Sequence, residues 1–123
     1  MERPTETRAM MNAAGIGTIL QLVMVIAGNF SPAVASLFAV LGMLISMIAG
    51  GMYAAWAGAA RSRAAGGGAI AGGVCGLIGI AASVAMGDVE TSLLLFGTAS
   101  SAVTGAIGGL LTSAVLGRRK ALA

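Results

Sequence analysis

The sequence predicts an all-α membrane protein, a single domain over residues 1–123 with four transmembrane helices arranged as two tandem hairpins. Of its residues, 58% are apolar and only 9% are charged, whereas soluble domains carry about 25% charged residues. The apolar residues fall into four long segments, and a helix needs about 20 residues to cross the hydrocarbon of a bilayer. Strands are not expected, because apolar residues run continuously instead of alternating with polar ones.

The first predicted helix covers about residues 12–27, which is short for a membrane span. Its charged start, its apolar run and the later Ala33-Val34-Ala35 also resemble a secretory signal with a cleavage site. We expect the segment to be retained, because its removal would leave three spans with a scrambled charge asymmetry.

The second predicted helix covers about residues 32–60 and is long enough to tilt or to project past the interface. Pro32 suits its first turn, where the missing N–H costs nothing, and Ser31 can cap it. Tyr53 and Trp56 lie near its end, where amphipathic rings favour the membrane interface.

The second half of the chain repeats this alternation of a shorter and a longer helix. The third predicted helix covers about residues 67–86 and follows a Gly66-Gly67-Gly68 run, which predicts a flexible turn between the two halves. The fourth begins at about Val89 or Thr91 and ends near residue 116. Asp88 is a candidate N-cap for this helix, favoured by the helix dipole.

The basic residues predict the topology. They occur only before the first segment, between the second and third, and after the fourth: Arg3, Arg8, Arg61, Arg63, Arg118, Arg119 and Lys120. Since Lys and Arg resist translocation, both termini are expected in the cytoplasm of a bacterial-type inner membrane. These flanks are suited to anionic lipid headgroups. No nucleic-acid partner is expected, because the basic residues form no patch with interleaved aromatic residues.

An internal repeat is also predicted, with one unit over about 12–61 and the other over about 67–119. Gly17 matches Gly76 at an offset of 59 residues, and after one deletion Met43 lies opposite Ser101 at an offset of 58. Each unit has two spans, so both would have the same orientation and be related by an axis along the membrane normal.

Small residues recur at every fourth position in three of the predicted helices. In a bilayer the hydrophobic effect does not drive helices together, because lipid tails are as apolar as the side chains. Small residues let two helix backbones approach closely, and the resulting van der Waals contact favours association. The set that we expect to pack or assemble is Gly42, Ser46, Gly50, Gly72, Gly76, Gly97, Ser101, Gly105, Gly109, Ser113 and Gly117. In the fourth helix a second column of small residues runs beside the first, which is more than one partner helix needs. This excess favours a subunit interface, although packing within one bundle or the lining of a pore would also account for it.

Strongly polar side chains are scarce within the apolar segments, although hydroxyl groups are common there. Gln21 is the most polar of them, and it is expected either to hydrogen-bond to another helix or to contact a solute. Ser100, Thr104 and Thr112 could line a narrow path, or they could bond to backbone carbonyls. The chain has no histidine, one cysteine (Cys75) and no ionisable residue in a span other than this thiol. No catalytic, cofactor-binding or metal-binding residue is therefore expected.

Two functions follow as hypotheses. The first is a non-enzymatic membrane protein that acts through helix–helix assembly, either as a homo-oligomer or as an accessory or structural subunit of a larger membrane complex. The second is a pore or carrier for a small or lipid-like solute, including a holin-like pore. The pore hypothesis predicts a continuous polar path past Gln21 and the hydroxyl groups of the fourth helix.

Overall fold

The computed structural model describes residues 4–58, 61–87 and 90–122, and every regular element within these ranges is a helix. The helices are α1 (Pro4–Phe30), α2 (Pro32–Ala35), α3 (Phe38–Ala57), α4 (Arg61–Ala85) and α5 (Leu93–Leu122). The segments long and apolar enough to cross a membrane are Thr7–Phe30, Val40–Ala57, Ser62–Ala85 and Leu93–Arg118. The predicted all-α fold with four candidate spans is therefore confirmed.

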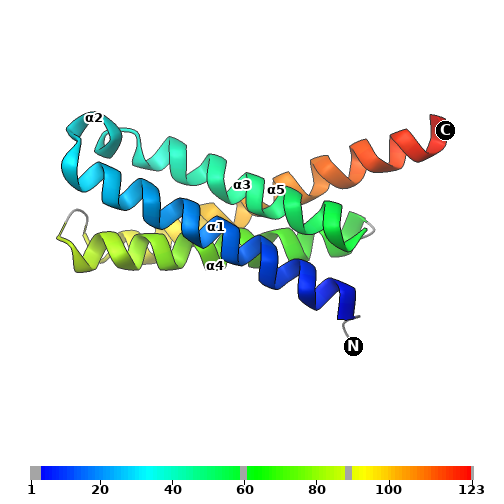
Figure 1. Ribbon diagram of the computed structural model, residues 1–123, viewed down its shortest axis with the longest axis horizontal. Helices are drawn as coiled ribbons and strands as arrows, with labels where there is room; N and C mark the ends of the chain where they lie inside the picture. The colour runs from blue at the N-terminus through cyan, green and yellow to red at the C-terminus, as the bar shows by residue number, and fades with distance from the viewer. Residues whose placement is uncertain (1–3, 59–60, 88–89, 123) are drawn as a thin grey trace.

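The four long helices form a bundle in which each runs antiparallel to the next (Figure 1). The start of α1, the end of α5 and the adjoining ends of α3 and α4 lie at one end of the bundle. Helix α2 and the adjoining ends of α4 and α5 lie at the other. We call the latter the α2 end. Helices α3 and α4 each pack against the three other long helices, while α1 and α5 share no extensive contact among the described residues. Helices α3 and α4 therefore form the middle of the bundle.

The first half of the fold differs from the prediction at two places. Helix α1 extends from Pro4 to Phe30, so the expected short first span is wrong. Polar residues before the apolar segment continue the helix, because an α-helix needs no apolar side chains to form its backbone hydrogen bonds. The predicted helix over 32–60 is also broken, since a single turn of helix, α2, precedes α3. Ser31 does cap α2, accepting a hydrogen bond from the Val34 N–H at 3.5 Å.

The glycine run does not form the turn between the halves. Residues 66–68 lie inside α4, and the chain instead leaves α3 at Gly58, which has a φ of 60° and donates its N–H to the Ala54 oxygen. A left-handed glycine at this position is a common helix terminator. A Cβ at Gly67 would overlap the ring of Tyr53, and one at Gly68 would overlap the Gly105 oxygen. Packing between helices, and not turn propensity, therefore explains this glycine run.

The ends of α5 also differ from the prediction. The helix begins at Leu93, later than expected, and ends at Leu122, so the basic segment 118–120 continues it. The proposed cap, Asp88, lies outside the described residues. The two aromatic residues predicted to lie at the membrane interface have different surroundings. Trp56 is 47% exposed, whereas Tyr53 is buried at the inner side of α3.

The two hairpins pack in different registers. Gly17 of α1 packs against Ala49 of α3, where an added Cβ would lie 3.0 Å from the Ala49 Cβ. Its sequence counterpart Gly76 packs against Ser101 of α5, which corresponds to Met43 and not to Ala49. Six residues separate Met43 from Ala49, about 9 Å along a helix. The internal repeat therefore stays a prediction about the sequence.

Candidate functional site

Three helices approach one another backbone to backbone at a crossing formed by Gly50 of α3, Gly68 and Gly72 of α4, and Gly105 of α5. A Cβ at Gly105 would overlap the Gly68 oxygen and lie 2.9 Å from the Gly72 Cα. One at Gly50 would overlap the Gly105 oxygen. We call this the glycine crossing, and it holds three helices together without side chains.

The two columns of small residues on α5 face two different helices of the same chain. Along the first column, a Cβ at Gly109 would overlap the Ala64 oxygen of α4, and Ser101 packs on Gly76 of the same helix. Along the second, a Cβ at Gly108 would overlap the Met47 oxygen of α3. Thr112 also belongs to the second column and lies against Gly51, whose added Cβ would be 2.8 Å from the Thr112 Oγ1. Packing within the bundle thus accounts for the double column over most of its length.

The predicted packing residues at the ends of the stripes have other surroundings. Gly97 faces the Ile80 side chain, and Gly42 faces Gln21, with ordinary spacing of 3.6 Å from an added Cβ to the Gln21 Oε1. Ser113 is half-buried, and Gly117 is exposed with nothing within 4 Å of an added Cβ. The last part of the α5 stripe therefore lies outside the tight contact.

A buried polar cluster lies next to the glycine crossing. Gln21 donates through Nε2 to the Gly42 oxygen at 3.2 Å and to the Ser46 Oγ at 3.4 Å. Ser46 in turn donates to the Gly72 oxygen at 3.4 Å, and the Cys75 thiol donates to the same oxygen at 3.3 Å. All three side chains are at most 3% exposed. The cluster joins α1, α3 and α4 through hydrogen bonds of these side chains.

Replacing Ser46 with Ala should lower the free energy of unfolding by about 1 to 2 kcal/mol, because it removes the acceptor for Gln21 and the donor to Gly72. Unfolding can be followed by denaturation in mixed micelles. Ser36→Ala is the matched control, since the Ser36 hydroxyl bonds only to Ala33 within an exposed turn. Equal stability of the two variants would contradict this role for Ser46.

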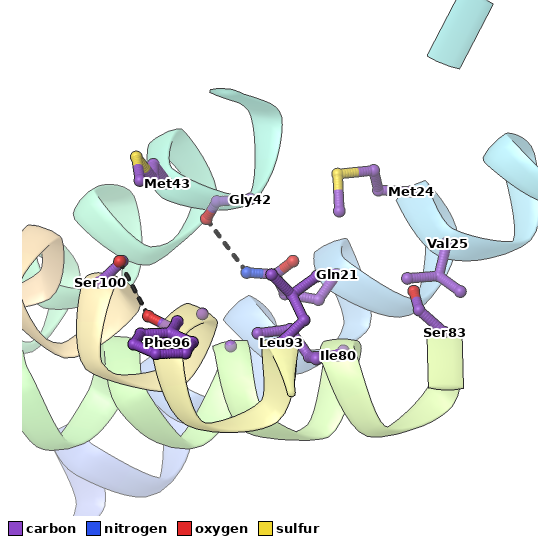
Figure 2. Close-up of a pocket in the computed structure, with 13 residues that line it drawn as sticks. Gln21, Met24, Val25, Gly42, Met43, Ile80, Ser83, Leu93, Phe96 and Ser100 are labelled. Atoms are coloured by element: carbon purple, nitrogen blue, oxygen red, sulfur yellow. Dashed lines mark hydrogen bonds between the residues drawn. The ribbon is translucent and has the colours of Figure 1, made fainter. Parts of the chain in front are cut away.

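A cavity of about 190 Å³ adjoins the polar cluster on the side of the α2 end, as Figure 2 shows. All four long helices contribute to its wall. Among the described residues that line it none is ionisable, and most are apolar: Gln21, Met24, Val25, Gly42, Met43, Gly76, Gly79, Ile80, Ser83, Leu93, Phe96, Gly97 and Ser100.

The cavity exists because α3 and α5 cross and then separate. They touch at the glycine crossing and at the Met47–Gly108 contact, and Figure 1 shows them diverging toward the α2 end. Three lining residues on these helices are partly exposed: Met43 by 42%, Leu93 by 40% and Phe96 by 68%. The mouth of the cavity therefore lies between α3 and α5, on the outer surface of the bundle.

The hydroxyl groups predicted to line a path along α5 bond mainly to their own helix. Ser100 donates to the Phe96 oxygen at 2.9 Å, and Thr104 donates to the Ser100 oxygen. Of the predicted solute contacts, only Gln21 and Ser100 reach the cavity, whereas Thr104 and Thr112 do not line it.

Sequence reasoning missed several residues of the cavity wall. Ser83 is one more small residue of the third predicted helix, four residues after Gly79, and its spacing does not reveal that its side chain faces a cavity. The apolar wall residues Met24, Leu93 and Phe96 carry no distinguishing signal, because such residues occur throughout the spans.

These features define a class of protein: an all-α chain with four helices that could each cross a membrane, which indicates a multi-pass membrane protein. Comparison with known proteins finds no matching family model, no similar curated protein and no similar solved structure.

Proposed function

We propose that this protein is a non-enzymatic membrane protein that binds a small apolar or lipid-like molecule in the cavity between α3 and α5. The observation that carries the proposal is a cavity of about 190 Å³ whose mouth opens on the outer surface of a bundle of membrane-spanning length. For comparison, an apolar cavity of about 150 Å³ stays dry and binds benzene. The cavity is therefore large enough for a small ring or for the end of a longer chain.

The inner side of the cavity is closed, which favours a carrier or binding protein over a pore. Beyond Gln21 and Ser46, the glycine crossing brings the backbones of three helices into contact. The hydroxyls of Ser100 and Thr104 bond to carbonyls of α5 instead of lining a continuous path.

Filling the cavity should abolish binding. In liposomes that contain a photoreactive alkane carrying a diazirine, we expect saturable labelling of cavity residues, including Met43 and Phe96. Gly42→Leu should reduce this labelling at least tenfold, because a Cβ at Gly42 fits at ordinary contact distances and the rest of the side chain would enter the cavity.

Gly15→Leu is the matched control, since an added Cβ there meets nothing within 4 Å and the residue is exposed. It should leave labelling of the cavity unchanged. Labelling that is spread evenly over exposed residues such as Ile19 and Val103, and that Gly42→Leu does not alter, would contradict the proposal.

We further propose a bacterial-type inner membrane with both termini in the cytoplasm. The described basic side chains Arg8, Arg63 and Arg118 are exposed, and their helix ends share the end of the bundle opposite α2 (Figure 1). Reporter fusions after Lys120 and at Arg61–Arg63 should read as cytoplasmic, and fusions at Asn29 or Asp88 should not. A cytoplasmic reading at Asn29 would overturn this orientation.

Assembly is a second candidate, favoured by the C-terminal part of α5. In Figure 1 this part extends beyond the bundle, and Ala114, Val115 and Gly117 on it are exposed. It would contact another copy or another membrane subunit. Gly117→Leu should then reduce the mass of the complex measured without detergent, and an unchanged mass would count against this interface.

A further inference from the structure

We infer that the molecule bound in the cavity is a neutral amphiphile with a hydroxyl group, which accepts a hydrogen bond from Ser83 and donates one to Gln21. This inference rests on the proposed function and names the chemical class of its ligand. It starts from two polar atoms on the cavity wall whose hydrogen-bonding capacity the described residues leave unused.

The first atom is the Gln21 Oε1. The Gln21 Nε2 faces the Gly42 oxygen, which can only accept, so the orientation of the amide is fixed. The Oε1 then lies on the opposite side, 3.2 Å from the position of an added Cβ at Gly79. No described residue donates a hydrogen bond to it. An unused amide oxygen in the apolar part of a membrane protein favours a ligand that donates.

The second atom is the Ser83 Oγ. The residue is only 4% exposed, and its hydroxyl bonds to none of the described residues. Figure 2 shows it among the side chains that line the cavity, with its oxygen turned toward the same space as the Gln21 side chain. Ser100, by contrast, already donates to its own helix at 2.9 Å. Ser83 is therefore the hydroxyl on the wall with a proton available to a ligand.

The spacing of Gly79 and Ser83 along α4 is compatible with one hydroxyl oxygen between the two atoms. Gln21 stands over Gly79, and Ser83 is four residues further along the same face of α4. Four residues of helix advance about 6 Å. An oxygen that hydrogen-bonds to two polar atoms bridges about 5 to 6 Å between them. A single hydroxyl group can therefore accept from Ser83 and donate to Gln21.

The rest of the wall selects for a neutral molecule with an apolar body. None of the described residues that line the cavity is ionisable, so a carboxylate or an ammonium group would find no counter-charge among them. A water molecule could satisfy both polar atoms, but it would leave the walls formed by Met24, Ile80 and Phe96 without contacts. The volume accommodates the hydroxyl end of the ligand, and a longer chain would leave through the mouth between α3 and α5.

Competition against the photoreactive alkane tests this inference. Decan-1-ol, decane and decanoate are compared at equal mole fractions in the membrane, with labelling of Met43 and Phe96 as the readout. Decan-1-ol should compete about tenfold better than decane, and decanoate at neutral pH should compete no better than decane. In Ser83→Ala the advantage of decan-1-ol should fall to about threefold or less, while Ser92→Ala, on an exposed turn, should retain it.

Ser83→Ala should keep the thermal stability of the parent protein, because no hydrogen bond within the described chain is lost. Equal competition by decane and decan-1-ol would overturn the inference and leave the proposed binding function standing. A full alcohol advantage in Ser83→Ala would also overturn it. If no compound reduces cavity labelling, the proposed function itself fails.

Discussion

Replacing Gly105 with Ala should strongly destabilise the folded bundle. The added Cβ would overlap the Gly68 oxygen and stand 2.9 Å from the Gly72 Cα, so the backbone of α4 has to move. Overpacking a well-packed core costs about 1 to 3 kcal/mol, and here no flexible side chain can give way. We expect a loss of at least 3 kcal/mol.

The chain provides its own probe for this measurement. Cys75 is the only cysteine, and its side chain is fully buried. The rate at which a thiol-reactive fluorophore labels it therefore reports opening of the bundle. Gly105→Ala should increase this rate at least a hundredfold, whereas Gly117→Ala, on the same helix with open space around it, should leave it unchanged. Equal rates in the two variants would show that the glycine crossing contributes nothing to stability.

This result also changes how an assembly experiment must be designed. Gly105 and Gly109 belong to the small-residue stripe that predicts a subunit interface, but both lie against α4 of the same chain. Large substitutions at either position would disperse a complex by unfolding its subunits. Substitution of Gly117 tests assembly without this difficulty.

The second large effect is expected from Gln21→Glu. A carboxylate would place an oxygen where the amide Nε2 now donates to the Gly42 oxygen at 3.2 Å, so an attraction becomes a repulsion. A charged carboxylate near the middle of a membrane helix costs about 2.5 to 3.5 kcal/mol. The variant should therefore lose stability by about that amount, and cavity labelling should fall with it.

Gln21→Leu is the matched control, because it removes the same hydrogen bonds without adding a charge and should cost about 0.6 to 2 kcal/mol. The difference between the two variants should depend on pH. A free glutamate loses its proton above about pH 4.3, so the charge, and the part of the penalty that depends on it, should grow as pH rises above that value. Below that pH the penalty should shrink toward that of Leu. A difference that does not change with pH would contradict burial of this site.

The fold class and the number of spans could be predicted from the sequence because they depend on composition and on segment length. The helix ends could not be predicted as well. Gly66-Gly67-Gly68 has the composition of a turn, yet it forms helix because Tyr53 and Gly105 occupy the space where side chains would be. The polar start of α1 continues the helix where hydropathy falls. In both places, the local composition alone does not predict where the helix begins or ends.

The candidate site was only partly predictable. Gln21 is conspicuous as an amide within an apolar span, and its bond to another helix follows from the cost of burying it unpaired. The cavity beside it depends on where α3 and α5 cross, and the position of that crossing cannot be predicted from any single residue. Ser83 resembles the other small residues of its stripe, and only the divergence of the two helices distinguishes it.

The glycine crossing has a consequence for how this protein can change during evolution. Its helices meet through main-chain atoms, which every amino acid possesses, while large apolar side chains such as Ile19, Val103 and Leu111 face outward. Selection is therefore expected to act on residue size at a few inner positions and to leave the identity of the outer residues free to drift. Descendants of one ancestor could then keep this architecture while their sequences diverge almost everywhere else.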